Sequence, residues 1–440
     1  MRDYVEKLLR RGEMRVVERE VDPRFELAAV VERSQADSSK PILFRKVKGT
    51  ALPVVSNLFG SNARICEILG TPPGRLCQRW AELMQRVAAM GPDHTRVVHE
   101  SAGLVSGRIG DLPRITWREK DLGPYITAGV FLAKDPQTGV PNLSFCRTFM
   151  KSDRELVCDI APPHDLAQYQ AKAEANGEPL EIAILIAPPP EIFVAACASV
   201  PIDVDEMKIA SAIRGRPLEV RACETVALEV PVDTQVVIEG SIRPGVRATE
   251  GPFGEFMGYY GPVNPNGYVI DVRRVSWRPD AIFHGLLCGT AEDLAALDVG
   301  FATRTYSALA SVPGILDVAC NPMFYCTVVK IDKRYEGQAR QVMLKVFAAN
   351  LNYNFVCIVV DKDIDPRDLR EVFSAYLTRG RVDRRTWVLE DVPGWDHSTN
   401  PTLGGRVGID ATTPLGREAE YERARTPGSD TLRLADYLPL

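Results

Sequence analysis

The chain has 440 residues, of which 45% are hydrophobic and 25% are charged, a balance typical of a folded soluble protein with about two to four domains. Its 58 acidic and 53 basic residues are well mixed and leave a net charge of -5, which argues against nucleic acid or an anionic membrane as a partner. No apolar run approaches the roughly 20 residues that cross a bilayer, and the N-terminus lacks a signal-peptide pattern, so we expect a cytoplasmic protein.

The ten cysteines predict reduced thiols. They form no C-x-x-C pair, and several lie inside apolar stretches such as the one around Cys197. We therefore expect core residues, and a disulfide framework is not indicated.

Residues 1–112 predict an N-terminal α/β module. An apolar helix pattern at the start is followed by a short strand at 53–57 and a second helix at 75–89. Gly91 and Pro92 then break the helical pattern.

Residues 113–305 are rich in short β-type runs separated by proline and glycine. This punctuation is typical of a barrel or sandwich. The clearest runs are 143–145, 182–186, 234–238, 268–270 and 281–283.

Residues 306–440 alternate between strand and helix patterns, which predicts an α/β unit with a covered sheet. The expected strands are 325–331 and 355–360, and the expected helices are 337–350 and 366–379. The end of the chain is expected to be either frayed or docked on a neighbour, and its apolar residues resemble a docking segment. Its apolar residues are Leu432, Leu434, Tyr437, Leu438 and Leu440.

Glu250 and Glu255 form the most informative local pattern. They lie five residues apart across a Gly-Pro-Phe-Gly turn that can bring both acids to one side of a pocket. Phe253, Phe256 and nearby tyrosines surround them, and apolar surroundings raise a carboxyl pKa whereas a guanidinium lowers it. We interpret the pair as an acid/base site with a proton donor and a charge partner.

Four stretches in order along the chain resemble the UbiD family of reversible decarboxylases, which use prenylated FMN. They are 142–147, 205–220, 250–258 and 360–365. The resemblance spans most of the chain and implies an α/β (α+β) multidomain fold: an N-terminal α/β module, a central split β-barrel-like flavin-binding domain and a C-terminal α/β oligomerisation domain.

By motif match, the family's catalytic arginine and two acids look like Arg147, Glu250 and Glu255. A guanidinium can hold a carboxylate through paired hydrogen bonds without losing its charge. Arg147 would keep Glu250 ionised, and Glu255 would return a proton to carbon after CO2 leaves.

The resemblance also implies a divalent ion, Mn2+ or Mg2+, that holds the cofactor phosphate, with K+ nearby. The matching ligands look like Asn142, His164 and Glu206, and oxygen ligands with one imidazole suit a hard ion. These residues and Arg147 would bind the cofactor, which a separate flavin prenyltransferase supplies in the family.

Decarboxylation leaves an electron pair on carbon, so it needs an electron sink that ordinary side chains do not provide. The sequence has neither a G-x-G-x-x-G fingerprint nor a P-loop, which argues against a dinucleotide or nucleoside triphosphate enzyme. Prenylated flavin supplies the missing chemistry in the family that the chain resembles.

Residues 284–305 follow the catalytic loop, and His284 and Arg304 are the candidate substrate ligands. If Arg304 faces the pocket, it could bind a second carboxylate of the substrate, whereas a surface salt bridge is the competing interpretation. The expected substrate is an aromatic, heteroaromatic (furan or pyrrole type) or α,β-unsaturated carboxylic acid.

Two other functions fit the same residues. One is a Mn-dependent hydrolase that uses Asn142, His164 and Glu206, and the other is a subunit of a multi-subunit aromatic carboxylase. Self-association as a homodimer or homohexamer is expected from the family resemblance.

Overall fold

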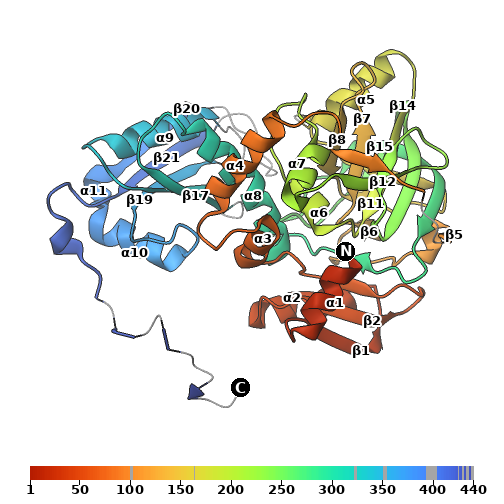
Figure 1. Ribbon diagram of the computed structural model, residues 1–440, viewed down its shortest axis with the longest axis horizontal. Helices are drawn as coiled ribbons and strands as arrows, with labels where there is room; N and C mark the ends of the chain where they lie inside the picture. Colours follow the sequence, from red (N-terminus) through yellow and green to blue (C-terminus); the bar gives the residue numbers. More distant parts are fainter. Residues whose placement is uncertain are drawn as a thin grey trace.

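The protein is described here as a computed structural model. The structure describes residues 1–99, 103–162, 164–321, 325–349, 354–392, 404–424, 426–428, 431–432 and 436–437. Within these ranges helices and strands are mixed along the whole chain, and the predicted fold class is confirmed (Figure 1).

The first part of the chain builds a small mixed sheet in the order β1-β2-β3-β16. Its elements are α1 (Arg2–Arg10), β1 (Arg15–Val21), α2 (Glu26–Asp37), β2 (Ile42–Val47), β3 (Val54–Ser56), α3 (Asn62–Leu69) and α4 (Leu76–Ala88). The fourth strand, β16 (Phe283–His284), comes from much later in the chain and pairs parallel to β3. The sheet therefore ties the region that follows Glu250 and Glu255 to the N-terminal part.

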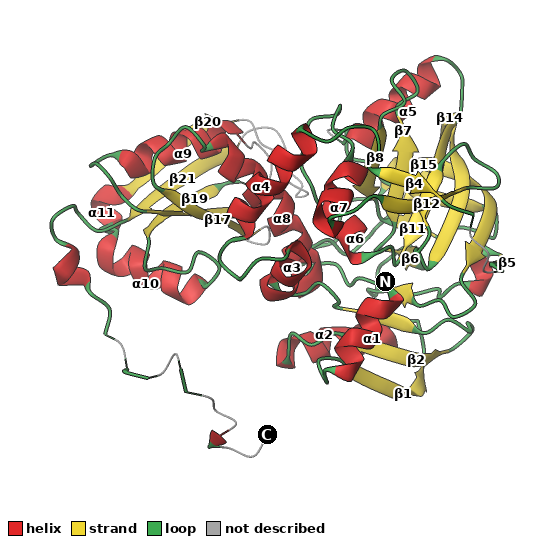
Figure 2. Ribbon diagram, in the orientation of Figure 1, coloured by secondary structure: helices red, strands yellow, loops and turns green. Residues whose placement is uncertain are grey.

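The central part is an antiparallel sheet that curls into a half-barrel, with helices on its outer side (Figure 2). Its order is β6-β9-β10-β15-β14-β11-β7-β8, and β5 adds to β15. The strands are β5 (Val105–Gly107), β6 (Tyr125–Ile126), β7 (Val130–Lys134), β8 (Pro141–Phe145), β9 (Thr148–Phe149), β10 (Glu155–Cys158), β11 (Leu180–Ile186), β14 (Val236–Glu250) and β15 (Asn264–Trp277). The helices are α5 (Asp165–Ala175), α6 (Pro190–Ala196) and α7 (Glu206–Arg214), and a small sheet joins β4 (Thr95–Val97), β12 (Leu218–Ala222) and β13 (Glu229–Pro231).

Strand β11 shows why this sheet lies inside the molecule. Ile182 and Ile184 face one hydrophobic core, and the alternate residues Ala183 and Leu185 face the other. Side chains of a strand alternate between its two faces, so a strand covered on both faces is a continuous apolar run. The run at 182–186 is such a strand.

The last part forms a sheet in the order β17-β18-β19-β21-β20, flanked by helices. Its elements are α8 (Ala291–Ala308), β17 (Ile315–Asn321), β18 (Cys326–Ile331), α9 (Gln338–Ala349), β19 (Val356–Asp361), α10 (Leu369–Arg379), α11 (Val382–Arg385), β20 (Thr386–Val392) and β21 (Gly404–Ala411). Helix α10 begins three residues later than predicted because Asp368 caps it and accepts the N–H groups of Arg370 and Glu371. Asn350, the last residue of the other predicted helix, lies outside the described residues.

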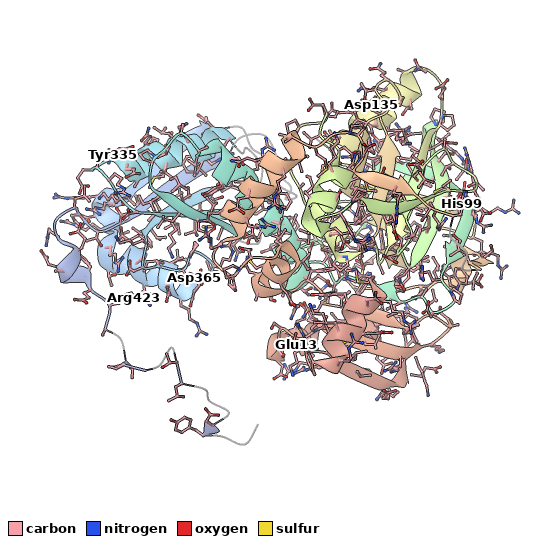
Figure 3. The ribbon with its side chains drawn as sticks, in the orientation of Figure 1. Glu13, His99, Asp135, Tyr335, Asp365 and Arg423 are labelled. Atoms are coloured by element: carbon pink, nitrogen blue, oxygen red, sulfur yellow. The ribbon has the colours of Figure 1, made fainter. Side chains whose placement is uncertain are left out.

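Helices α4 and α8 lie between the C-terminal sheet and the central part (Figure 1). Figure 3 places Tyr335, Asp365 and Arg423 on the C-terminal unit, far from Asp135 on the central one. Helices α4 and α8 can therefore line a site to which residues of both units contribute.

The predicted docking tail is described at two of its five apolar residues. Leu432 and Tyr437 are exposed, whereas Leu434, Leu438 and Leu440 lie outside the described residues. The ten cysteines are free thiols, as predicted. Within the described ranges no helix has the length and apolar character needed to span a membrane.

Candidate active site

Arg147, Glu250 and Glu255 meet beside the curled sheet. Arg147 follows β8, Glu250 is the last residue of β14, and Glu255 lies in the loop after it. Arg147 donates from Nε to Glu250 Oε1 at 3.0 Å and from Nη2 to Glu250 Oε2 at 2.8 Å. It also donates from Nη1 to Glu255 Oε1 at 2.7 Å. One guanidinium therefore holds Glu250 through two bonds and Glu255 through one.

The guanidinium of Arg147 has one N–H group that no described residue accepts. Of its five N–H groups, Nε uses one and Nη2 uses both, the second of them on Asp159 Oδ2 at 3.0 Å. Nη1 uses one, on Glu255, and its second N–H has no hydrogen-bond partner among the described residues. A substrate carboxylate could take this donor next to Glu255.

Glu250 is fully buried and its carboxylate accepts hydrogen bonds from two residues. The hydroxyl of Tyr125 donates to Glu250 Oε1 at 3.0 Å, the same oxygen that accepts from Arg147 Nε. Burial raises the pKa of Tyr125, and the negative charge of Glu250 adds to the rise, so the hydroxyl stays a donor. A methyl group at Gly267 would lie 2.8 Å from Glu250 Cβ, so glycine leaves the room that this acid occupies.

Glu255 is a buried acid whose pKa is raised. Burial raises its pKa to about 7, against the opposing charge of Arg147, and the charges of Asp159, Asp293 and Glu250 raise it further. The side chain is 7% exposed. Near neutral pH, Glu255 can therefore give up or take a proton.

Asn142 and Glu206 form a second polar cluster. Asn142 Nδ2 donates to Glu206 Oε1 at 3.2 Å, and the N–H of Leu143 donates to Oε2 at 3.1 Å. Burial raises the pKa of Glu206 to about 8, and the charge of Asp205 adds to the rise. Glu206 forms no ion pair with a described residue, so it is a buried acid that would be stabilised by a cation.

His164 precedes α5 at its N-cap position and lines the same cavity as Asn142 and Glu206. A group of three or more His, Cys, Asp and Glu side chains that could hold a metal is not found among the described residues. The ligand set implied by the family contains only two residues of these types, His164 and Glu206, because the third ligand, Asn142, is an amide.

A cavity of about 920 Å³ lies between α4, β8, α6, α7 and α8. This is the size of a site for a cofactor with a small substrate. Arg147, Glu250 and Glu255 are not among its lining residues. Two lining residues are linked to them: Phe145 lies two residues before Arg147 in the chain, and the charge of Asp293 acts on Glu255.

The cavity face of α8 follows helical spacing. Asp293, Leu297, Gly300 and Arg304 all line the cavity, and steps of four, three and four residues keep them on one side of the helix. Asp293 Oδ2 accepts the N–H of Gly289 at 2.8 Å. The cavity face of α8 thus carries an acid, Asp293, in the first turn of the helix and a cation, Arg304, near its end.

Arg304 lies on the exposed rim of this cavity, where Nη1 donates to Ser199 Oγ at 3.3 Å. It forms no ion pair with an acid in the described part of the chain, so the salt bridge considered for it from the sequence is not found there. A cation without a counter-charge at a cavity rim can bind an anionic ligand.

His284 occupies a different place from the pocket wall expected from the sequence. It is fully buried, packs against Phe59 and Phe193, and its Nε2 lies 3.0 Å from Glu292 Oε1. The pairing of β16 with β3 turns it into the N-terminal core. It therefore contacts the base of α8 and is absent from the described cavity lining.

Three residues that hydrogen-bond to Arg147, Glu250 or one another at this site were not predicted from the sequence: Tyr125, Asp159 and Asn264. Asp159 had a weak signal, because it is the acid that directly follows the apolar strand β10. Tyr125 and Asn264 reach the cluster only through sheet pairing and had no local signal.

Three family models match consecutive parts of the chain. They describe the N-terminal domain (residues 5–84), the Rift-related domain (94–291) and the C-terminal domain (301–411) of 3-octaprenyl-4-hydroxybenzoate carboxy-lyase, under the family name UbiD. The matches cover most of the chain in the expected order.

Individual proteins agree over the full length. Anhydromevalonate phosphate decarboxylase of Methanothermobacter thermautotrophicus is 33% identical over 432 residues, covering 96% of this chain and 99% of that protein. The UbiD-class enzyme HmfF from Pelotomaculum thermopropionicum, solved in complex with FMN, is 34% identical over 99% of both chains with a TM-score of 0.89. An evolved dimeric form of HmfF in complex with prFMN is 33% identical over 99% of both chains, with a TM-score of 0.87. With this fold and these three matching domains, the chain belongs to the UbiD family of carboxy-lyases.

Proposed function

We propose that the protein is a reversible, non-oxidative decarboxylase that uses prenylated FMN and acts on an aromatic, heteroaromatic or α,β-unsaturated acid. The observation that carries the proposal is the guanidinium of Arg147 hydrogen-bonded to both Glu250 and Glu255, in a chain whose cavity of about 920 Å³ is lined by Phe145 and Asp293. The family membership and the flavin complexes of HmfF support the cofactor. They favour a carboxy-lyase over the hydrolase considered from the sequence.

The side chains fit the two needs of the reaction. The free N–H of Arg147 Nη1 can orient the substrate carboxylate, and Glu255 can protonate carbon after CO2 leaves. Glu250, itself held by the hydroxyl of Tyr125, accepts hydrogen bonds that hold the guanidinium in place. Prenylated flavin, when bound, would supply the electron sink for the electron pair that stays on the substrate carbon when CO2 leaves.

We propose Asn142, His164 and Glu206 as the site of a divalent ion, Mn2+ or Mg2+, with K+ alongside, that fixes the cofactor phosphate. All three residues line the cavity. The buried carboxylate of Glu206, with acidic neighbours and no described ion pair, fits a hard cation.

We expect Glu206→Gln to weaken metal binding by about 10- to 100-fold, because it removes the only charged ligand of the set. Metal analysis and flavin absorbance of the purified protein measure the loss. Glu219→Gln, at a glutamate of β12 paired with Arg96 outside the cavity lining, serves as the matched control. Normal metal and flavin content in Glu206→Gln would remove Glu206 from the site.

We propose that the substrate carries a second anionic group, a carboxylate or a phosphate, bound by Arg304. The guanidinium at the cavity rim, which forms no ion pair with a described acid, supports this assignment. A relative that is 33% identical is named anhydromevalonate phosphate decarboxylase, which makes a phosphorylated unsaturated acid a substrate to test. Aromatic and furan-type diacids form the other test group.

We expect Arg304→Ala to raise KM for an acid with a second anionic group by about 10- to 100-fold, the effect of losing a charged hydrogen bond. KM for the matching monoacid should change far less. Steady-state CO2 release measures both constants, with Arg384→Ala on exposed α11 as the control. Equal changes for both acids would place Arg304 outside the substrate site.

The direct test of the proposed function is CO2 release by full-length protein produced together with a flavin prenyltransferase. Acids of the three classes are tested with and without a second anionic group. Release from at least one class, with flavin absorbance on the protein, is expected. Colourless protein that hydrolyses esters or amides in the presence of Mn2+ would instead support the hydrolase.

We propose a homodimer or homohexamer that associates through the C-terminal unit. Exposed apolar side chains on α10 and β20, namely Phe373, Leu377 and Val388, support an interface there. The dimeric form of HmfF is consistent with association in the family. The set of Arg147, Glu250 and Glu255 makes this chain the active subunit in any larger carboxylase assembly.

A further inference from the structure

Asp159 is a third acid on the guanidinium of Arg147. It follows β10, is partly buried, and its Oδ2 accepts an N–H of Arg147 Nη2 at 3.0 Å. The same nitrogen donates to Glu250 Oε2 at 2.8 Å. Asp159 and Glu250 together occupy both hydrogens of Nη2, so the guanidinium cannot turn in its plane without breaking one of these bonds.

Asn264 fixes the position of Asp159. The N–H of Asn266 donates to Asn264 Oδ1 at 2.8 Å, which orients the amide so that Nδ2 is the donor toward Asp159. Asn264 Nδ2 then reaches Asp159 Oδ1 at 2.8 Å. Both oxygens of Asp159 are therefore acceptors. Asn264 pairs in register with Glu250 across β14 and β15, so one sheet contact positions Glu250 and the support of Asp159 together.

We propose that Asp159 is a positioning residue of the active site: it holds Arg147 through Nη2 so that Nη1 faces Glu255, and it shares the guanidinium charge so that Glu255 keeps its proton. The inference rests on the proposed role of Glu255 as proton donor. Asp159 itself is not among the residues that line the cavity, and it acts through Arg147.

The charge balance around Glu255 supports this role. Arg147 is the positive group that acts on Glu255, and the negative groups are Asp159, Asp293 and Glu250, which come from three different segments. The attraction of Arg147 lowers the pKa of Glu255, and the charges of the three acids oppose it. Without Asp159, more of the guanidinium charge is free to stabilise ionised Glu255. Glu255 would then lose its proton at lower pH.

The test is Asp159→Asn in the full-length protein, with the titration of Glu255 followed by NMR of glutamate side chains labelled with 13C at the carboxyl carbon. The resonance of Glu255 is the one missing from Glu255→Gln. We expect the titration midpoint to fall by about half a pH unit or more in Asp159→Asn. In cofactor-loaded protein, the loss of CO2 release at high pH should move down by the same amount. Asp159→Glu keeps the charge and should restore the midpoint.

Asp271→Asn is the matched control, because Asp271 pairs with Arg243 on the same sheet away from Arg147. The titration midpoint of Glu255 in Asp271→Asn should equal that in the unmodified protein. An unchanged or raised midpoint in folded Asp159→Asn would overturn the inference, even if the enzyme is active. The proposed function is tested separately. It would be refuted if unmodified protein loaded with cofactor released no CO2, even with the lowered Glu255 midpoint observed in Asp159→Asn.

A second variant covers the case in which Asp159→Asn does not fold. Asn264→Ala leaves the charge of Asp159 but removes its tether. We expect kcat to fall about tenfold with KM nearly constant, because the guanidinium is misplaced while the cavity is intact. Full kcat in Asn264→Ala would overturn the holding role of Asp159.

Discussion

Glu255→Gln should abolish CO2 release while the protein still binds flavin. The amide keeps the shape of the side chain but cannot donate an acidic proton to carbon, and a general acid contributes typically about 10²- to 10⁴-fold in rate. The substitution leaves Asn142, His164 and Glu206 intact at the other cluster. Turnover is measured as CO2 release, and cofactor content as flavin absorbance of the same sample.

The pH dependence gives an independent check on Glu255. With its pKa at about 7, raised chiefly by burial, the protonated form is present below that pH and is lost above it. The protonation step should therefore slow as pH rises through about 7. Glu181→Gln, at a partly exposed glutamate paired with Arg273, is the control and should retain activity. A fully active Glu255→Gln protein would refute the assigned role.

Arg147→Leu should lower the free energy of unfolding by about 3–5 kcal/mol and abolish turnover, because removing one partner of a buried ion pair leaves its charges uncompensated. Glu250 is fully buried, and Asp159 and Glu255 share the same guanidinium. Arg147→Lys keeps one charge but cannot form the paired bonds to Glu250. It should regain part of the stability and little of the activity. Urea unfolding and CO2 release measure the two effects.

Arg243→Leu provides the comparison for this stability effect. Arg243 also binds two acids, Asp271 and Glu155, but on a more exposed part of the same sheet. Ion pairs of that kind contribute about 0–1 kcal/mol. An Arg147→Leu protein as stable as Arg243→Leu would show that the buried acids at the site are not stabilised by the guanidinium.

Local patterns were sufficient for several of the helices and strands. The apolar run at 182–186 became β11, and the helix expected at 75–89 became α4 (Leu76–Ala88). Such patterns succeed because burial imposes its period on the sequence directly. Caps shifted the ends, as Asp368 did at the start of α10.

The partners of the site depend on contacts between distant segments. Asp159 and Asn264 are 105 residues apart, and their hydrogen bond exists because β10 and β14 both pair with β15. His284 shows the reverse case: its position after the catalytic loop suggested a pocket residue, but pairing of β16 with β3 buries it. Asp159 had only the weak signal of an acid that directly follows an apolar strand, and the burial of His284 had no local signal.

The sequence by itself determined the resemblance to the UbiD family, and that resemblance implied the roles proposed for an arginine with two acids and for a separate set of Asn, His and Glu. These follow from residue types in local motifs, which the chain carries before it folds. The tertiary structure decided the environment: which donors of Arg147 are occupied, that Glu255 titrates near neutrality, and that Arg304 lies at the cavity rim without a described ion pair. Desolvation, charge separation and hydrogen-bond direction are set by neighbours distant in sequence, so only the folded chain defines them.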